Sequence, residues 1–544
     1  MKRLFLLFAV AAVLHLQAWD VEHDEIAQLA GEFLPAEIKK NFSFSDFGIL
    51  MSCCHFPDMT EWGNPRRWRT LEEMGEYVGE DDVAVFRKYG FKHAGSLHSP
   101  LGRAISISLL AKSFKEKRFS AAAFYISELT HSISDESALN HPPLLHFIQY
   151  SKFEGVDYRI RKVEESAKNV FGFRSDGYVM HRTRELLKDY SPKVPEGCRT
   201  FAGMRESFVA LCVDHGAYAA EKEGLIAFAP VSDAGEALAR LVAMQVKCLV
   251  DMAWSAWSMR ESWELPLPGY EKEIDKTIEA KLRKTSPRGQ SVFAGVFDDS
   301  RNPENPSKTI ALVCEPYGVF SKTKLSYVGR MLGASVCRTL RDNGIAVKGI
   351  GFFDLENEIP SVRDVQGLWI HLGSSNMSGE QVAAIKKYVS GGGILYAVGG
   401  TDPFDVTGFK KHLRLRENGE VPVSSKWGVQ NAGVWDKMSI VFDPALGLGE
   451  KTEALRRNPN IDGFCKPYAR CSIDLADGIE PLVWLDNGKE KFCVAARKGN
   501  VFWLSEYLLM PFLFSDDTVL DWGEMRLDST ASKLVLKIAG TERQ

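Results

Sequence analysis

The residues best suited to chemistry in this chain are histidines and carboxylates near its N-terminal end. Seven of the 12 histidines lie between His23 and His146, and the segment His131-x3-Asp135-x5-His141 is the most informative part. On a helix, the spacing of four places His131 and Asp135 one turn apart on the same face. Neutral imidazole and carboxylate groups are ligands that zinc accepts. A surface histidine–aspartate pair has the same spacing, so the spacing alone leaves both readings open.

The first residues predict a cleaved signal peptide over 1–18. A short basic start is followed by an apolar stretch over 4–16 and by a small residue, Ala18, at the expected cleavage point. The apolar stretch is shorter than the ~20 residues that a membrane-spanning helix needs. We therefore expect an exported protein, periplasmic or secreted, with no stable membrane span.

Cleavage at that point would leave Trp19 as the N-terminal residue. Its free α-amine and its carbonyl oxygen could chelate a metal, and His23 follows one helical turn later. Other candidate ligands lie beside predicted apolar or helical segments. Asp58 ends the phrase Phe56-Pro57-Asp58, His98 precedes a predicted helix, and Glu154 lies four residues after Tyr150.

Taken together, these positions resemble the zinc-dependent phospholipase C family. That family includes bacterial phosphatidylcholine-hydrolysing enzymes and the catalytic region of GPI-specific phospholipase D, and the single-strand-specific zinc nucleases of fungi are its relatives. The resemblance covers 19–172 by motif and extends to about 263 by helical architecture. It implies an all-helical domain that binds up to three zinc ions. The implied ligands are Trp19, His23, Asp58, His98, His131, Asp135, His141 and Glu154.

The resemblance also implies how the ligands are shared. Asp135 would bridge two zinc ions, one of which is bound by Asp58, His98 and His131 and the other by Trp19 and His23. His141 and the helical pair that ends at Glu154 would hold the third ion.

Two positions depart from the family pattern. Tyr150 stands where the family has histidine, and a phenol with a pKa of about 10 is a poor zinc ligand at neutral pH. His146 could take its place, or the third site could be weak or empty. The histidine before the next helix is either His93 or His98, and we predict His98. We interpret the other histidines of this half as surface or packing residues: His55, His181 and His215.

The chemistry implied by such a site is phosphodiester hydrolysis. Clustered zinc ions polarise phosphoryl oxygens and supply hydroxide near neutral pH, and Asp58 is the predicted catalytic residue that orients or deprotonates the water. The predicted function is a zinc-dependent phosphoric diester hydrolase, phospholipase C-like, whose substrate is a phospholipid or a nucleic acid. The alternatives are a single-strand nuclease and a catalytically degenerate, metal-stabilised binding protein. The resembling nucleases place an aromatic residue directly after the histidine that corresponds to His98, and the resembling phospholipases place one after the aspartate that corresponds to Asp58. In this chain no aromatic residue follows His98, and Met59 follows Asp58, so the sequence favours neither substrate class.

Periodicity predicts the elements that position these residues. Apolar residues at three-and-four spacing over 24–33, 104–114, 120–133 and 234–257 predict an all-helical domain over 19–265. The Pro-rich and charged stretch 266–306 reads as a linker that contains at most one helix.

From 307 to 544 short apolar runs alternate with helical segments. Strands predicted at 309–314, 345–350, 368–372 and 394–398, together with helices at 325–341 and 378–389, indicate a parallel sheet. Antiparallel hairpins are predicted over 479–507. The complete prediction is therefore a multidomain protein with an all-α domain followed by an α/β domain.

The phrase over 378–395 resembles the flavodoxin-like fold of class I glutamine amidotransferases. Active members carry a cysteine directly after such a strand, and here the strand is followed by Gly399-Gly400-Thr401. The three glycines at 391–393 precede the strand and predict a turn, because a phosphate-binding loop follows a strand. The resemblance thus implies a non-catalytic binding or scaffold domain with an unknown ligand.

Composition excludes several classes of protein. The chain is 45% hydrophobic, which excludes disordered and low-complexity proteins. A formal net charge of −4 excludes capture of nucleic acid by the charge of the whole chain. The ten cysteines include no CxxC pair, so the sequence gives no support for a thiolate zinc site.

Overall fold

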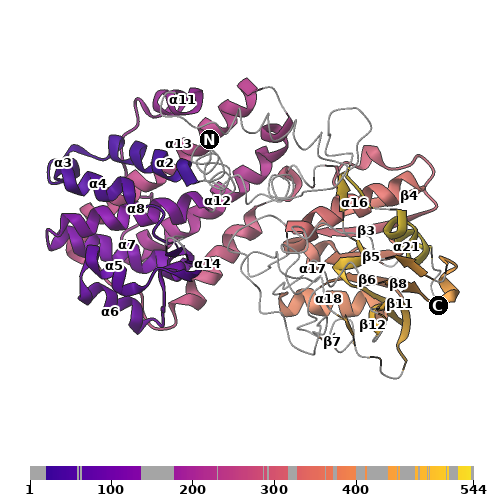
Figure 1. The fold of residues 1–544 in the computed structure, drawn as a ribbon. Coiled ribbons are helices and arrows are strands. Elements are labelled where there is room, and N and C mark those ends of the chain that lie inside the picture. The colour runs from indigo at the N-terminus through magenta and orange to yellow at the C-terminus, as the bar shows by residue number, and fades with distance from the viewer. Residues whose placement is uncertain are drawn as a thin grey trace, which may run out of the picture. The chain divides into compact units, whose positions relative to one another are not determined.

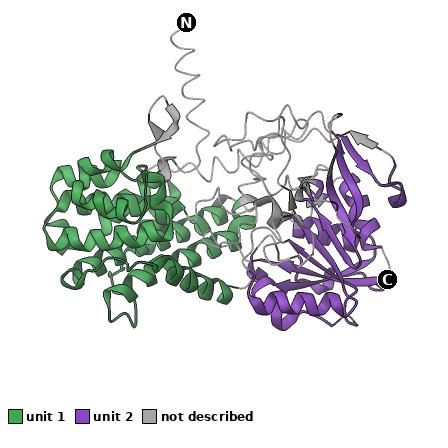
Figure 2. Ribbon diagram, turned by 90° about the horizontal axis from the view of Figure 1, so that it is seen from below, with its two compact units in different colours: residues 1–142, 166–284, 318–320 green, residues 143–165, 285–317, 321–544 purple. Residues whose placement is uncertain are grey.

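The structure is a computed structural model. It describes residues 20–57, 60–61, 64–135, 177–228, 231–285, 287–290, 293, 295–315, 327–361, 363–371, 377–399, 411–412, 439–449, 451–453, 472–473, 475, 478–486, 488, 491–509, 511–513, 525–527 and 529–540. Two compact units divide these residues after Lys284 (Figure 2). The first is largely helical and the second contains a mixed sheet, which agrees with the predicted α and α/β content. The predicted signal peptide lies outside the described residues.

The helical unit consists of helices joined mostly by short connections. Its elements are α2 (Asp20–Phe33), α3 (Ala36–Lys39), α4 (Phe44–Ser52), the hairpin of β1 (Thr60–Glu61) and β2 (Asn64–Trp68), α5 (Leu71–Val78), α6 (Glu80–Lys88), the 3₁₀ helix η2 (Ala94–His98), α7 (Pro100–Lys115), α8 (Phe119–Asp135), α11 (Tyr178–Leu187), α12 (Phe201–Phe228), α13 (Val231–Ser258), η3 (Arg260–Ser262) and α14 (Tyr270–Lys284). Each helix predicted from the apolar spacing is present. The hairpin is the one departure from an all-helical unit among the described residues.

Helix α8 lies at the centre of this unit. Its side chains are buried from Ala121 to Ser134, and it packs against α7, α4, α2 and α13 (Figure 1). Serine and threonine hydroxyls on buried helices donate hydrogen bonds to the carbonyls one turn earlier, as Thr130 Oγ1 does to the Ile126 carbonyl at 2.9 Å. The helix can therefore carry polar side chains through a core.

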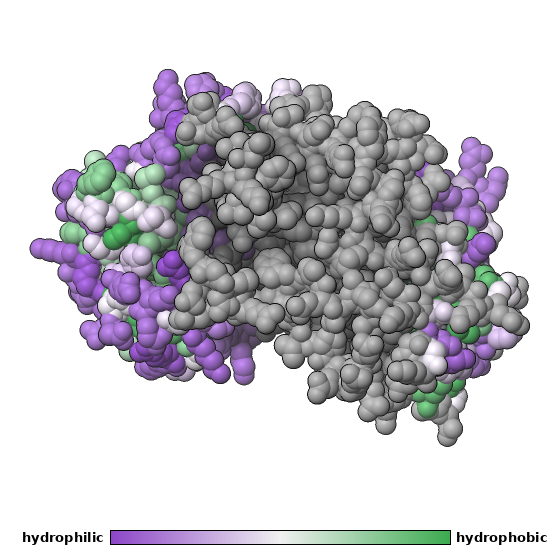
Figure 3. Space-filling view, in the orientation of Figure 1, coloured by the Kyte–Doolittle hydropathy of each residue, from purple (hydrophilic) through white to green (hydrophobic). Residues whose placement is uncertain are grey.

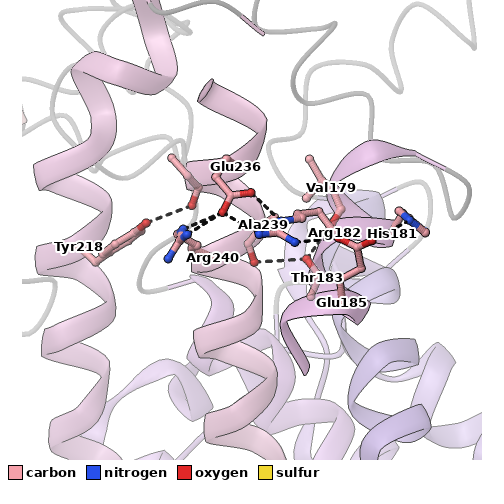
Figure 4. Close-up of polar contacts among 10 residues, drawn as sticks. Val179, His181, Arg182, Thr183, Glu185, Tyr218, Glu236, Ala239 and Arg240 are labelled. Carbon is pink, nitrogen blue, oxygen red and sulfur yellow. Dashed lines mark hydrogen bonds and ion pairs between the residues drawn. The ribbon is translucent and has the colours of Figure 1, made fainter. Parts of the chain in front are cut away.

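Polar contacts join helices α13 and α11 (Figure 4). The Arg182 guanidinium lies 2.8 Å from a Glu236 oxygen, and Thr183 Oγ1 donates to the carbonyls of Val179 and Ala239 at 2.7 and 3.3 Å. Thr183 is fully buried, so this hydroxyl satisfies acceptors that water does not reach. These contacts fix the position of the helix that packs beside α2 and α8.

The expected linker 266–306 is divided between the two units. Helix α14 buries Tyr270, Ile274, Ile278 and Leu282 at four-residue spacing and packs on α12 and α7. Further along, Phe293 and Val296 are buried, and the Arg341 guanidinium donates to the carbonyls of Val296 and Asp298 in the second unit. This stretch is consequently part of both folded units.

The second unit is built on a nine-stranded sheet with the order β4-β3-β5-β6-β13-β12-β11-β8-β9. The strands from β4 to β13 run parallel, and the rest are antiparallel. Their bounds are β3 (Lys308–Cys314), β4 (Ile345–Gly351), β5 (Gly367–His371), β6 (Ile394–Val398), β8 (Ser439–Phe442), β9 (Lys451–Glu453), β11 (Glu480–Asp486), β12 (Lys491–Lys498) and β13 (Val501–Leu504).

Helices and small elements complete this unit. They are α16 (Tyr327–Asp342), α17 (Leu355–Glu358), α18 (Gly379–Ser390), α21 (Ser529–Ala539), the 3₁₀ helices η4 (Pro287–Gly289), η5 (Asp299–Arg301), η6 (Phe352–Asp354), η7 (Pro444–Leu446) and η9 (Glu506–Leu509), and the paired strands β7 (Lys411–His412) with β10 (Ser472–Ile473) and β14 (Pro511–Leu513) with β15 (Met525–Leu527). Ser378 caps α18 with Gln381 as its capping-box partner. Gly392, at φ +94, lies in a turn before β6, as predicted for the three glycines.

The predicted strands and hairpins are present, but one pairing joins them in an unexpected way. Strand β13 pairs antiparallel with β12 and parallel with β6, with Val501 opposite Leu395. The hairpins therefore extend the parallel sheet instead of forming a separate layer.

One face of the described surface is shown by hydropathy. Figure 3 shows hydrophilic residues over much of the described part of this face, with a hydrophobic patch on the helical unit and smaller ones on the α/β unit. Among the described residues the most exposed large apolar side chains are Phe44 and Leu267, at 97% and 74%. No helix among the described residues is long and apolar enough to cross a membrane.

Candidate metal centre

Side chains from three segments of the helical unit converge beside α8. Ligand atoms of His23 on α2 and of His131 and Asp135 on α8 all lie within 4.8 Å of one another. The ring of His98, at the end of η2, brings its Nε2 to 3.0 Å from Nε2 of His131. We call these four residues the histidine cluster. His23 and His131 are buried, at 2% and 1% exposure.

The spacing on α8 places two members of the cluster on one face. His131 and Asp135 are one turn apart, and Asp135 is the last residue of the helix and is half-buried. The prediction that these two side chains face one point is confirmed.

The turn before α7 positions His98. Its Nδ1 lies 3.0 Å from the Gly95 carbonyl, and because a carbonyl can only accept, Nδ1 carries the proton. The lone pair of Nε2 then points toward His131. Gly102 of α7 permits this arrangement, since a Cβ there would be 2.6 Å from the Leu97 carbonyl oxygen. The contact with His131 supports His98 in the choice between His93 and His98.

A hydroxyl of α8 fixes the ring of His23 in the same way. Ser134 Oγ donates its single proton to the Thr130 carbonyl at 2.6 Å, so at the 2.6 Å contact with His23 it accepts from Nδ1. In the neutral ring, the Nε2 atom of His23 then carries no proton. Imidazoles that bind metals typically donate their other nitrogen to such an oxygen.

A buried carboxylate lies one helical turn before Ser132. Burial raises the pKa of Glu128 to about 7, although Ser106, Ser132, His98 and Arg103 act in the opposite direction. Ser132 Oγ donates to it at 2.9 Å, and Arg103 donates to the His98 carbonyl at 3.2 Å. This buried charge network supports the backbone of the turn that carries His98.

A second group of possible ligands adjoins the histidine cluster. Atoms of Asp24, Cys54 and His55 also lie within 4.8 Å of one another, and we call them the thiol cluster. The His55 ring centroid is 5.6 Å from that of His23 and 6.3 Å from that of His131. His55 therefore packs beside the histidine cluster, at a position where its ring could also bind a metal. Neither Cys54 nor His55 was among the candidate ligands predicted from the sequence.

Asp24 interacts with both other members of the thiol cluster, and these interactions shift the pKa values of Asp24 and Cys54. Burial raises the pKa of Asp24, but hydrogen bonds from His55 and Cys54 outweigh it and hold the pKa below its usual value. Burial, followed by the charge of Asp24, raises the pKa of the Cys54 thiol far above its ordinary value. Without a metal the pair is therefore a thiol that donates to a carboxylate.

The other histidines of this unit fit their interpretation. His181 is exposed and lies 3.3 Å from Glu185. His215 is buried, and burial, with Arg103 and Lys281 nearby, lowers its pKa to about 4. The remaining predicted site residues lie outside the described residues: Trp19, Asp58, His141, His146, Tyr150 and Glu154.

The donor set of the histidine cluster fits zinc. It consists of imidazole nitrogens and one carboxylate, and two of the imidazoles have their Nε2 atoms prepared as ligands by contacts at Nδ1. Zinc–nitrogen bonds of ~2.0–2.1 Å at the tetrahedral angle place two nitrogens ~3.3 Å apart. The 3.0 Å between His98 and His131 is close to that separation. The same distance suits an N–H···N hydrogen bond between the two rings when no metal is bound.

Comparison with known proteins adds no relative to this picture. No protein-family model, no curated protein and no solved structure matches the chain. The resemblance to the zinc-dependent phospholipase C family stays a prediction from the sequence.

Proposed function

We propose that the helical unit is a zinc-dependent phosphodiesterase similar to phospholipase C. The observation that supports this proposal most directly is the convergence of His23, His98, His131 and Asp135. Three imidazoles and a carboxylate from three separate segments, two of the rings oriented by contacts at Nδ1, are more than a surface histidine–aspartate pair needs.

In this proposal the histidine cluster holds the metal. Asp135 would be shared between two zinc ions, and Trp19, Asp58, His141 and Glu154 would supply the other ligands implied by the resemblance. When bound, zinc polarises phosphoryl oxygens and supplies hydroxide near neutral pH. Ser134 and the Gly95 carbonyl keep the protons of His23 and His98 on Nδ1, so that Nε2 is available in each ring.

Asp58 is the proposed catalytic residue. Its carboxylate would orient the attacking water and take a proton from it as the water oxygen bonds to phosphorus. The phosphorus–oxygen bond to the leaving group would break, and the departing alkoxide would take a proton from solvent to leave as an alcohol. The substrate class is a phosphodiester of a phospholipid or of a nucleic acid. For the α/β unit we propose a non-catalytic, amidotransferase-like binding or scaffold role, and for the whole protein export from the cytoplasm.

Metal analysis of the purified full-length chain tests the proposal. Asp135→Asn should lose zinc and should hydrolyse bis-p-nitrophenyl phosphate at least about tenfold more slowly, because a bridging carboxylate is removed. The matched control is Asp189→Asn, which removes an exposed carboxylate of the same unit. Unchanged zinc content and turnover in Asp135→Asn would refute the assignment. Parallel assays with phosphatidylcholine vesicles and single-stranded DNA separate the two substrate classes.

A further inference from the structure

We propose that the thiol cluster, Asp24, Cys54 and His55, is a second metal site that takes a thiophilic divalent cation such as zinc. None of these three residues belongs to the ligand set implied by the family resemblance. The proposal stands on the cluster's own geometry and does not rest on phosphodiesterase activity.

Two side chains converge on one carboxylate oxygen. Cys54 Sγ lies 2.9 Å and His55 Nε2 lies 3.2 Å from the same atom, Oδ1 of Asp24. Zinc bonds of ~2.0–2.3 Å to oxygen, nitrogen and sulfur at tetrahedral angles separate such ligand atoms by ~3.4–3.6 Å. Each of these two contacts would therefore lengthen by less than about 1 Å in a coordination shell, and all three ligand atoms already lie within 4.8 Å of one another.

Binding would exchange a proton for the cation. The Cys54 thiol loses the proton that it now donates to Asp24, and this proton leaves to solvent as the sulfur–metal bond forms. The His55 ring now donates from Nε2 to Asp24, so this proton must also leave Nε2, either to Nδ1 within the neutral ring or to solvent from the doubly protonated ring. The Nε2 lone pair then binds the cation, and one proton stays on Nδ1. Because no electron is transferred, the step needs no co-reactant.

The packing of two helices creates the cluster. Asp24 lies on α2, and Cys54 and His55 lie in the turn that follows α4, which packs against α2. Cys54 is fully buried, but the side chains of Asp24 and His55 are 49% and 18% exposed. A cation there would have three protein ligands and a side open to water, as catalytic zinc sites do.

The two clusters differ in the metals that they favour. The histidine cluster offers nitrogen and oxygen, whereas the thiol cluster adds sulfur, which soft metals prefer. A thiolate ligand also gives a distinctive spectroscopic signal with cobalt(II), a common substitute for zinc. Sulfur-to-cobalt charge transfer absorbs in the near ultraviolet, whereas nitrogen and oxygen ligands give mainly the visible ligand-field bands.

Cobalt(II) titration of the metal-depleted full-length chain tests the proposal. We expect a charge-transfer band that saturates with bound cobalt and disappears in Cys54→Ser. The matched control is Cys53→Ser, because Cys53 is a neighbour that is also buried and its sulfur lies 3.9 Å from Ser52 Oγ and outside the cluster. Asp24→Asn, at a half-exposed position, should weaken cobalt binding at this band by at least about tenfold.

The outcomes separate this site from the histidine cluster. Ligand-field bands without a charge-transfer band in the wild-type chain would overturn the thiol site and leave the histidine site standing. A charge-transfer band that persists in Cys54→Ser would also overturn it. Loss of hydrolysis in Asp135→Asn with the charge-transfer band retained supports both sites. If Cys54→Ser does not fold by circular dichroism, Asp24→Asn decides, and unchanged cobalt affinity in that variant refutes the proposal.

Discussion

Replacing Ser134 by alanine tests whether this hydroxyl holds His23 ready to bind a metal. Ser134 is fully buried and accepts from His23 Nδ1 at 2.6 Å. Without it, the imidazole proton can move to Nε2, where it competes with the metal. Loss of such a contact typically weakens metal binding by about 10–100-fold, which corresponds to ~1.4–2.7 kcal/mol. The free energy of unfolding of the metal-free chain should also fall, by about 1–3 kcal/mol, because a buried donor loses its acceptor.

Competition against a chromophoric zinc chelator measures the first effect, and denaturant unfolding of the metal-free protein measures the second. Ser127→Ala is the matched control, since Ser127 is buried on the same helix and its hydroxyl donates to the Leu50 carbonyl at 2.6 Å. Both variants should lose comparable stability, but only Ser134→Ala should lose zinc affinity. Equal zinc affinities in the two variants would refute the positioning role of Ser134.

Three further perturbations probe other parts of the chain. Gly102→Ala should push the turn that carries His98 away from α7, because the new Cβ would meet the Leu97 carbonyl. The free energy of unfolding should fall by about 1–3 kcal/mol, and zinc affinity should fall as well. Denaturant unfolding measures the first effect and chelator competition the second. Burial lowers the pKa of His371 to about 3, so between pH 6.5 and about pH 3 the unfolded state binds a proton that the folded state does not. Stability should therefore fall as pH drops from about 6.5 toward 3, and His371→Leu should flatten this dependence by about 2–3 kcal/mol at pH 4.5, as read from denaturant midpoints. Residues left ahead of Trp19 should reduce zinc content and turnover without unfolding the chain, because a free α-amine can bind a metal whereas the amide nitrogen of a continuous chain cannot. Equal zinc content and turnover in the extended and processed proteins would remove Trp19 from the site.

Local periodicity was enough to predict much of the helical unit and part of its site. The apolar spacing of 120–133 predicts a buried helix, and a buried helix necessarily places His131 and Asp135 on one face. The strands of the α/β unit were predictable for a similar reason, since short apolar runs between helical segments are typical of parallel sheets. The charged stretch 266–306 was predicted to be a linker with at most one helix. That helix, α14, buries four residues at helical spacing and belongs to the helical unit, which its high charge did not indicate.

Contacts between elements were decided by the tertiary structure. The meeting of Asp24 with Cys54 and His55 depends on how α2 packs against α4, and the pairing of β13 with β6 joins segments about a hundred residues apart. The choice of His98 depends on a turn that packs on α7 at Gly102. The physical reason is common to all three. A sequence pattern states which face of an element is apolar, whereas the partner that covers this face is selected by side-chain packing over the whole unit.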